Sequence, residues 1–318
     1  MALSKAPAVT HVRVDEGSAG QRIDNFLVRV CKGVPKSHIY RILRSGEVRV
    51  NSKRVAQTYR LQEGDELRIP PIRLAERPDA PPVPVGKPFD IVFEDDALLV
   101  LDKPAGLAVH GGSGVSFGVI EQLRRQRPEA KFLELVHRLD RETSGLLIVA
   151  KKRSALTVLH DMMREGRVHK RYLTLVAGRW LNLQQHIKLA LHKYLTDDGE
   201  RRVSVSRDGK PAHSIVRLVK RWQRCSLVEV ELKTGRTHQI RVHLSHSGFP
   251  LFGDDKYGDF ALNKQLEKAG LRRMFLHAAK LAFRHPLTDQ EIELASPLPA
   301  ELAEFVASVE QNEEREYG

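Results

Sequence analysis

Cysteine is scarce in this sequence. The only two, Cys31 and Cys225, stand nearly 200 positions apart, which excludes a disulfide framework and zinc-binding cysteine pairs. The histidines His137, His238 and His243 could ligate a metal, but they belong to no His-Glu-x-x-His or Pro-Cys-x-x-Cys pattern. We therefore predict no metal site and interpret both cysteines as buried apolar residues in a reducing compartment.

Long apolar runs are also missing. No window approaches 18 consecutive apolar residues, which excludes a membrane-spanning helix. The segment Met1–Thr10 lacks the apolar stretch of a secretory signal. We therefore expect a cytoplasmic protein.

Acidic residues are in deficit as well, with 52 Lys and Arg against 40 Asp and Glu. The resulting net charge of +12 fits either a polyanionic partner or a basic protein without one.

The excess charge is concentrated near the N-terminus. Residues 20–70 hold eleven basic and five acidic side chains, an excess of six, which is half of the net charge. Apolar spacing predicts a helix over Ile23–Val30 and another up to Gly46, followed by short strands. Basic side chains cluster on the second helix and the hairpin after it. We predict that these contact an RNA phosphate backbone: Lys36, Arg41, Arg44, Arg49, Lys53 and Arg54.

Proline divides the chain. Seven of the sixteen prolines lie between Pro70 and Pro88, a composition that is typical of a stiff linker. The predicted organisation is therefore an N-terminal arm at 1–19, a small basic domain at 20–70, a linker at 71–88, a larger domain at 89–309 and a polar tail at 310–318.

The larger domain mixes both kinds of secondary structure. Runs rich in β-branched residues predict buried strands at Ile91–Phe93, Leu98–Leu101, Leu146–Val149 and Leu227–Leu232, and Ser154–Arg164 has helical spacing. Strand-rich segments between residues 168 and 232 favour antiparallel pairing over regular βαβ winding. The predicted class is α+β with a mixed, mainly antiparallel sheet.

Three polar segments interrupt this apolar framework: Leu101–Gly106, Val136–Gly145 and Leu232–Arg241. In the first, the close proline and glycine indicate a tight turn, and we interpret Lys103 as structural. In the second, Asp140 lies between Arg138 and Arg141. Taken alone, such a carboxylate is more often a surface ion pair than a catalyst. In a closed pocket, however, neighbouring guanidinium groups would keep it ionised and able to act as a nucleophile or base.

Together the three segments resemble the pseudouridine synthases that act on large-subunit ribosomal RNA. The resemblance rests on Asp102–Gly106, on Val136–Lys151 and on Thr234–Leu244, in that order. The basic domain is similar to the S4 RNA-binding domain through Gly20–Leu27 and Ser45–Asn51. Two further segments, Val34–Leu43 and Val109–Gly118, resemble one subgroup of this family.

The resemblance implies a role for each matching side chain. Asp140 would attack ribose C1′ or take a proton from C2′. Tyr172 would stack on the uracil and assist proton transfer, and Arg241 would form an ion pair with Asp140. Arg138 would fill the gap left by the flipped uridine. The same motifs imply that further side chains contact the substrate: Arg236, His238 and Gln239.

The implied partner is large-subunit ribosomal RNA, acted on by a monomer without cofactor or metal. Two alternatives stay open at this point. A noncatalytic RNA-binding protein would bind RNA without forming product. A nucleobase hydrolase using Asp140 would release free uracil, whereas isomerisation leaves the mass of the RNA unchanged.

Overall fold

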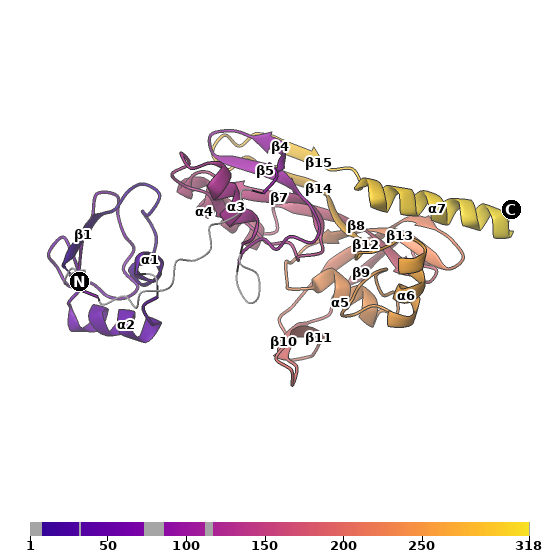
Figure 1. The fold of residues 1–318 in the computed structure, drawn as a ribbon, viewed down its shortest axis with the longest axis horizontal. Coiled ribbons are helices and arrows are strands. Elements are labelled where there is room, and N and C mark those ends of the chain that lie inside the picture. Colours follow the sequence, from indigo (N-terminus) through magenta and orange to yellow (C-terminus); the bar gives the residue numbers. More distant parts are fainter. Residues whose placement is uncertain (1–7, 32, 73–85, 112–116, 318) are drawn as a thin grey trace, which may run out of the picture. The chain divides into compact units, whose positions relative to one another are not determined.

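The computed structural model describes residues 8–31, 33–72, 86–111 and 117–317. The chain forms two compact units, Met1–Pro82 and Val83–Gly318 (Figure 1). Most of the predicted proline-rich linker, and part of the Val109–Gly118 segment, lie outside the described residues. None of the helices in the described ranges is both long enough and apolar enough to cross a membrane.

The first unit packs two helices against a small sheet. Its helices are α1 (Ile23–Val30) and α2 (Lys36–Ser45). The antiparallel strands β1 (Thr10–Arg13), β3 (Glu66–Ile69) and β2 (Arg49–Val50) lie side by side in that order. The apolar stripes that predicted the helices form one core with the strands.

The predicted N-terminal arm is wrong in part. Thr10–Arg13 pairs along its whole length with Glu66–Ile69 as strand β1, and Val14 is buried in the core. The strand was missed because His11 and Arg13 interrupt the apolar pattern, although an edge strand needs only one buried face.

The second unit is built on a ten-stranded sheet. Eight of its strands follow one path: β4 (Asp90–Glu94), β5 (Leu98–Lys103), β7 (Ser144–Ala150), β14 (Leu276–Arg284), β8 (His169–Ala177), β13 (Cys225–Leu232), β12 (Ser214–Arg221) and β9 (Gln184–Ile187). Two more pair at the side: β6 (Glu134–Leu135) with β7, and β15 (Glu291–Ala295) with β14. Among the strand pairs of the described residues, β7–β14 alone is parallel. This confirms the predicted mixed, mainly antiparallel sheet.

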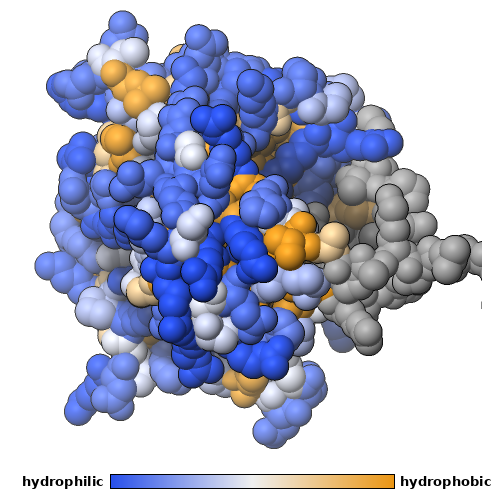
Figure 2. Space-filling model, turned by 90° about the vertical axis from the view of Figure 1, so that its left-hand side faces the viewer, coloured by the Kyte–Doolittle hydropathy of each residue, from blue (hydrophilic) through white to orange (hydrophobic). Residues whose placement is uncertain are grey.

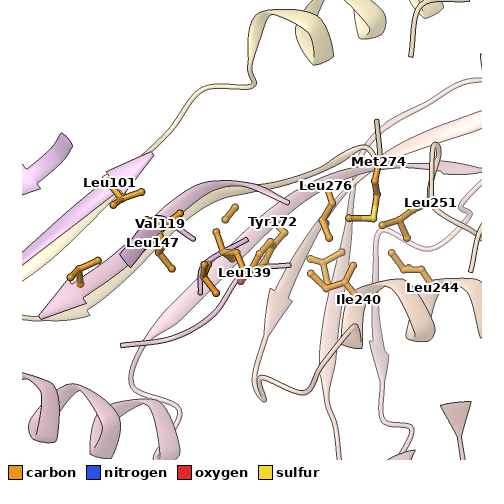
Figure 3. Packing of buried hydrophobic residues seen from close by; sticks show 14 of the residues in the cluster. Leu101, Val119, Leu139, Leu147, Tyr172, Ile240, Leu244, Leu251, Met274 and Leu276 are labelled. Carbon is orange, nitrogen blue, oxygen red and sulfur yellow. The ribbon is translucent and has the colours of Figure 1, made fainter. Parts of the chain in front are cut away.

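Helices cover both faces of this sheet. Side chains of α3 (Val119–Gln126) and α5 (Gln239–His246) join one core with Leu99, Leu147 and Tyr172 (Figure 3). The side chains of β5 and β7 that point to the opposite face of the sheet pack against α4 (Arg153–Arg164) in a second core. The helices α6 (Phe260–Lys268) and α7 (Ala300–Tyr317) share a third core with Leu175 and Leu227. Burial on both faces explains why β7 is an unbroken apolar run.

Gly145 allows the parallel pair to form at the end of the Val136–Gly145 segment. Its φ of +108° lies in a region that other residues rarely adopt. A side chain there would come within 2.4 Å of the Ala278 carbonyl oxygen on β14. Glycine therefore lets β7 approach β14 where the polar segment enters the sheet.

Two further features of this unit were not predicted. The strands β10 (Leu191–Leu195) and β11 (Arg201–Val205) form a separate hairpin that projects beside α5 (Figure 1). Residues 310–317, which belong to the predicted polar tail, continue helix α7. Lys220 pairs with Glu310 at 2.5 Å, and the Gln223 amide donates to Glu313. These contacts explain why so polar a segment stays helical.

Candidate active site

The loop between β6 and β7 carries Asp140, and a buried lysine and a mostly buried arginine hold the backbone of this loop. Lys103 Nζ donates to the carbonyls of Pro104, Leu107 and Arg141 at 2.8, 2.8 and 3.1 Å. Arg273 donates to the Glu142 carbonyl at 3.1 Å and to Ser144 Oγ at 2.8 Å. The structural role predicted for Lys103 is therefore confirmed, and Arg273 is an anchor that sequence reasoning missed.

The charge state of Lys103 reflects two opposing effects. Burial lowers the pKa of its ammonium group to about 7. Three carbonyl acceptors oppose that shift, because only the charged group has three hydrogens to donate. The ammonium also offsets part of the negative charge of Asp140.

Asp140 faces two side chains from the third polar segment. Its Oδ2 lies 3.7 Å from Arg241 Nη1 on α5, and its Oδ1 lies 3.9 Å from His238 Nε2. The side chain of Asp140 is 30% exposed, whereas that of Arg241 is only 5% exposed. The structure therefore brings together the predicted pair of Asp140 and Arg241, with the carboxylate open to a substrate.

Arg241 is held by a carboxylate that sequence reasoning missed. Asp254 accepts two hydrogen bonds from it, at 2.7 and 2.6 Å, and both side chains are buried. Burial disfavours the charge on Arg241, but these bonds outweigh it and raise its pKa above the ordinary range. The amides of Lys256 and Tyr257 also donate to Asp254. Arg241 thus stays ionised and keeps a fixed direction toward Asp140.

Tyr172 forms an aromatic wall beside Asp140. It lies on β8, is 5% exposed, and packs in the same core as Leu139 and Leu276 (Figure 3). Burial, together with the negative charge of Asp140, raises the pKa of its hydroxyl well above the usual value. Tyr172 is therefore a neutral phenol that offers a ring face and one proton.

The cleft next to this wall has a volume of about 770 Å³ and is strongly basic. Arg138 and Arg236, both predicted to contact substrate, line it with Asp140 and Tyr172. Lys170 also lines it and was missed, although it stands two residues before Tyr172 on the same face of β8. Burial lowers the pKa of Lys170 to about 8. A cleft with several cations and one carboxylate suits a phosphate-bearing ligand.

Gln239 is tied into its loop by four hydrogen bonds. Its carbonyl oxygen accepts from Thr234 Oγ1 and the Arg236 amide, and its amide nitrogen donates to His213 O and Ser214 Oγ. These four bonds use its hydrogen-bonding capacity. The side chain therefore shapes the loop that carries His238, and because Gln239 also lines the pocket at Asp140, its contact with substrate stays a prediction.

The six predicted RNA-contacting residues of the first unit are all exposed. The hydrogen bonds of Arg44, Arg49 and Arg54 go to nearby backbone carbonyls. Such bonds orient a guanidinium without neutralising its charge. The face of the molecule in Figure 2 is largely hydrophilic, with apolar residues in small separate groups, as suits a polar partner.

The site can therefore supply one ionised carboxylate, one neutral phenol and a basic rim. Within the four described ranges, no three His, Cys, Asp or Glu side chains gather closely enough to hold a metal. The constellation is suited to covalent or proton-transfer chemistry at a nucleotide.

Comparison with known proteins agrees with this geometry. The model of the RNA pseudouridylate synthase family matches residues 97–246, and that of the S4 domain matches residues 21–67. Relatives with about half of their residues identical cover almost the whole chain. The chain therefore belongs to the RNA pseudouridylate synthase family and is an RNA pseudouridine synthase with an S4 domain.

The relatives identify the subgroup. The chain is 52% identical over 302 residues to "Ribosomal large subunit pseudouridine synthase C" of Escherichia coli K12, covering 93% of this chain and 95% of that protein. It is 50% identical over 314 residues to the Yersinia pestis protein of that name, covering 96% and 97%. Human RNA Pseudouridylate Synthase Domain Containing 4 has a similar structure, with a TM-score of 0.57, 26% identity, and coverage of 70% of this chain and 93% of that one.

Proposed function

We propose that this enzyme converts uridines of large-subunit ribosomal RNA into pseudouridine, with Asp140 as the catalytic carboxylate. The observation that carries the proposal is the pairing of Asp140 with Arg241 beside the Tyr172 wall. The names of the relatives supply the class of RNA.

The reaction exchanges one bond for another within a single nucleotide. The N1–C1′ bond breaks, the uracil turns, and C5 bonds to C1′. The C5 proton is lost to solvent and N1 gains one, so the balance needs no oxidant, reductant or energy source. Asp140 would act by attacking C1′ or by removing the C2′ proton, and the ion pair with Arg241 would hold its carboxylate in place for either step.

Tyr172 and the basic residues that line the cleft would bind the detached uracil and its nucleotide. Tyr172 would stack against the uracil and relay the C5 proton, accepting it at the phenol oxygen while its own hydroxyl hydrogen passes to solvent. Arg138, exposed at the mouth of the cleft, would occupy the gap left by the flipped nucleotide. Unstacking costs a few kcal/mol, which the phosphate contacts of a basic cleft offset.

The substrate also bears on partners and location. The six exposed cations of the S4 domain would bind the RNA backbone and contribute affinity without reading sequence. We further propose that the enzyme works as a monomer in the cytoplasm. Sedimentation of the purified protein at micromolar concentration tests the monomer, which a dimer mass would contradict.

The proposed function is tested with RNA that carries tritium at uracil C5. The enzyme is incubated with unmodified large-subunit ribosomal RNA and, separately, with small-subunit ribosomal RNA. Release of tritium to water from the large-subunit RNA alone, without free uracil and without a change in RNA mass, is the expected result. Release from the small-subunit RNA alone would contradict the substrate class, and free uracil would indicate a hydrolase instead.

A further inference from the structure

Tyr257 has an arrangement of hydrogen bonds that the catalytic roles above do not use. Its hydroxyl oxygen lies 2.9 Å from the backbone nitrogen of Val203 and 2.8 Å from Nδ1 of His238. A backbone N–H can only donate, so the Tyr257 oxygen is the acceptor in the first contact. Among the hydrogen bonds of the described residues, Nδ1 of His238 is the one acceptor within reach of the hydroxyl hydrogen, so we assign Tyr257 as the donor and Nδ1 as the acceptor.

We propose that Tyr257 is a positioning residue that fixes the tautomer of His238, leaving its hydrogen on Nε2, the atom that faces Asp140. A neutral imidazole carries one hydrogen, so a ring that accepts at Nδ1 is protonated at Nε2. His238 is therefore a hydrogen-bond donor toward Asp140 or toward a substrate oxygen bound between them, and Nε2 cannot act as a base. The role of this donor in catalysis rests on the proposed function. The assignment of the tautomer is independent of that function.

The surroundings of His238 favour its neutral form on balance. Burial lowers the pKa of its ring, and the charges of Arg241 and Lys256 act in the same direction. The carboxylates of Asp140 and Asp254 oppose them. The ring is held at this place by its backbone as well, since His238 has a φ of +52°, which is uncommon for a residue other than glycine.

Tyr257 itself is fixed from three sides. Its carbonyl accepts a hydrogen bond from Ser245 Oγ at 2.7 Å, and its amide donates to Asp254. The guanidinium of Arg241 lies over its ring at 5.1 Å from the centroid. Val203, the donor to its hydroxyl, belongs to strand β11 of the projecting hairpin, and Arg202 next to it donates to the Lys256 carbonyl. The hairpin thus supplies the hydrogen bond that decides which nitrogen of His238 is protonated.

The tautomer is measured by nuclear magnetic resonance on the full chain labelled with ¹⁵N-histidine. The His238→Gln variant assigns the signals of His238 by their loss. The expected result for the wild type at neutral pH is a protonated Nε2 and an unprotonated Nδ1. In Tyr257→Phe, which keeps the ring but lacks the hydroxyl, we expect this preference to weaken. A protonated Nδ1 in the wild type, or an unchanged tautomer in Tyr257→Phe, would overturn the proposal.

Activity gives a second readout. Tyr257→Phe is expected to lower kcat about threefold to tenfold, the effect of one ordinary hydrogen bond, and to leave KM unchanged. The exposed tyrosine of β10, in Tyr194→Phe, is the matched control and should change neither the tautomer nor kcat. A Tyr257→Phe kcat equal to that of the wild type would contradict the catalytic part. Absence of tritium release by the wild type would instead refute the proposed function and leave the tautomer assignment standing.

Discussion

Asp140 lies at the end of a series of charged groups in which each group positions the next. Asp254 is held by two backbone amides and holds Arg241, and Arg241 faces Asp140. Sequence alone predicted the last pair through the resemblance of its motifs. It missed Asp254 because Gly253–Gly258 has the composition of a polar turn, and nothing local shows that a carboxylate there points inward.

Replacement of Asp254 tests the buried end of this series of charged groups. Asp254→Asn keeps the shape but leaves Arg241 as a buried charge with a weakened partner, which costs about 3 kcal/mol. We expect a lower free energy of unfolding in urea and a loss of kcat at temperatures where the variant is folded. The control is Asp255→Asn, because Asp255 touches the same guanidinium at 3.1 Å but is 71% exposed. Equal losses of stability and kcat in both variants would show that the buried pair of Asp254 and Arg241 is not what holds the site.

Lys103 gives the stability a dependence on pH. Its pKa is lowered to about 7 in the folded chain, against about 10.4 in an unfolded one. Between these values the unfolded chain binds more protons, so this residue makes the free energy of unfolding rise with pH. Lys103→Met should remove that part of the rise between about pH 7 and pH 10. Urea titrations of both proteins over this range test it, and parallel pH profiles would contradict the assignment.

At the scale of elements, the sequence predicts those whose pattern reports burial directly. The strand β7 was predicted because both of its faces are buried, and α1 because its apolar stripe is regular. Strand β1 and the end of α7 were not, since their stability comes from partners distant in sequence. The parallel pairing of β7 with β14 is likewise a tertiary property that no local pattern encodes.

Substitution of Gly145 tests the parallel pairing of β7 with β14. In Gly145→Ala the new carbon would meet the β14 backbone at 2.4 Å, in a conformation that alanine disfavours. We expect a loss of about 2–4 kcal/mol in the free energy of unfolding and a displaced Asp140 loop.

Gly166→Ala is the matched control, because Gly166 also has a positive φ of +72° but has open space around it. It should lose only about 1 kcal/mol, the cost of the backbone conformation itself. A Gly145→Ala variant no less stable than this control would show that the close approach of the two strands does not matter.

For the whole molecule, the division of labour between the two units can be tested without cutting the chain. Replacement of the six exposed S4 cations by Gln should weaken binding to large-subunit ribosomal RNA. Each lost phosphate contact should also make the negative slope of log affinity against log salt shallower, by about 0.7–0.9. Filter binding between 50 and 200 mM salt, within the range where such slopes are informative, measures both quantities. An unchanged slope would show that the basic module does not contact the backbone.

If Asp140 performs the isomerisation, tritium release should be lost in Asp140→Asn, and this is the variant to measure first. The variant keeps the size of the side chain and removes its charge, so RNA binding and the free energy of unfolding should stay close to those of the wild type. We expect tritium release by this variant to fall by at least about a thousandfold, the scale of loss seen when a reacting group is removed. A folded Asp140→Asn enzyme that releases tritium at the wild-type rate would show that Asp140 does not perform the reaction.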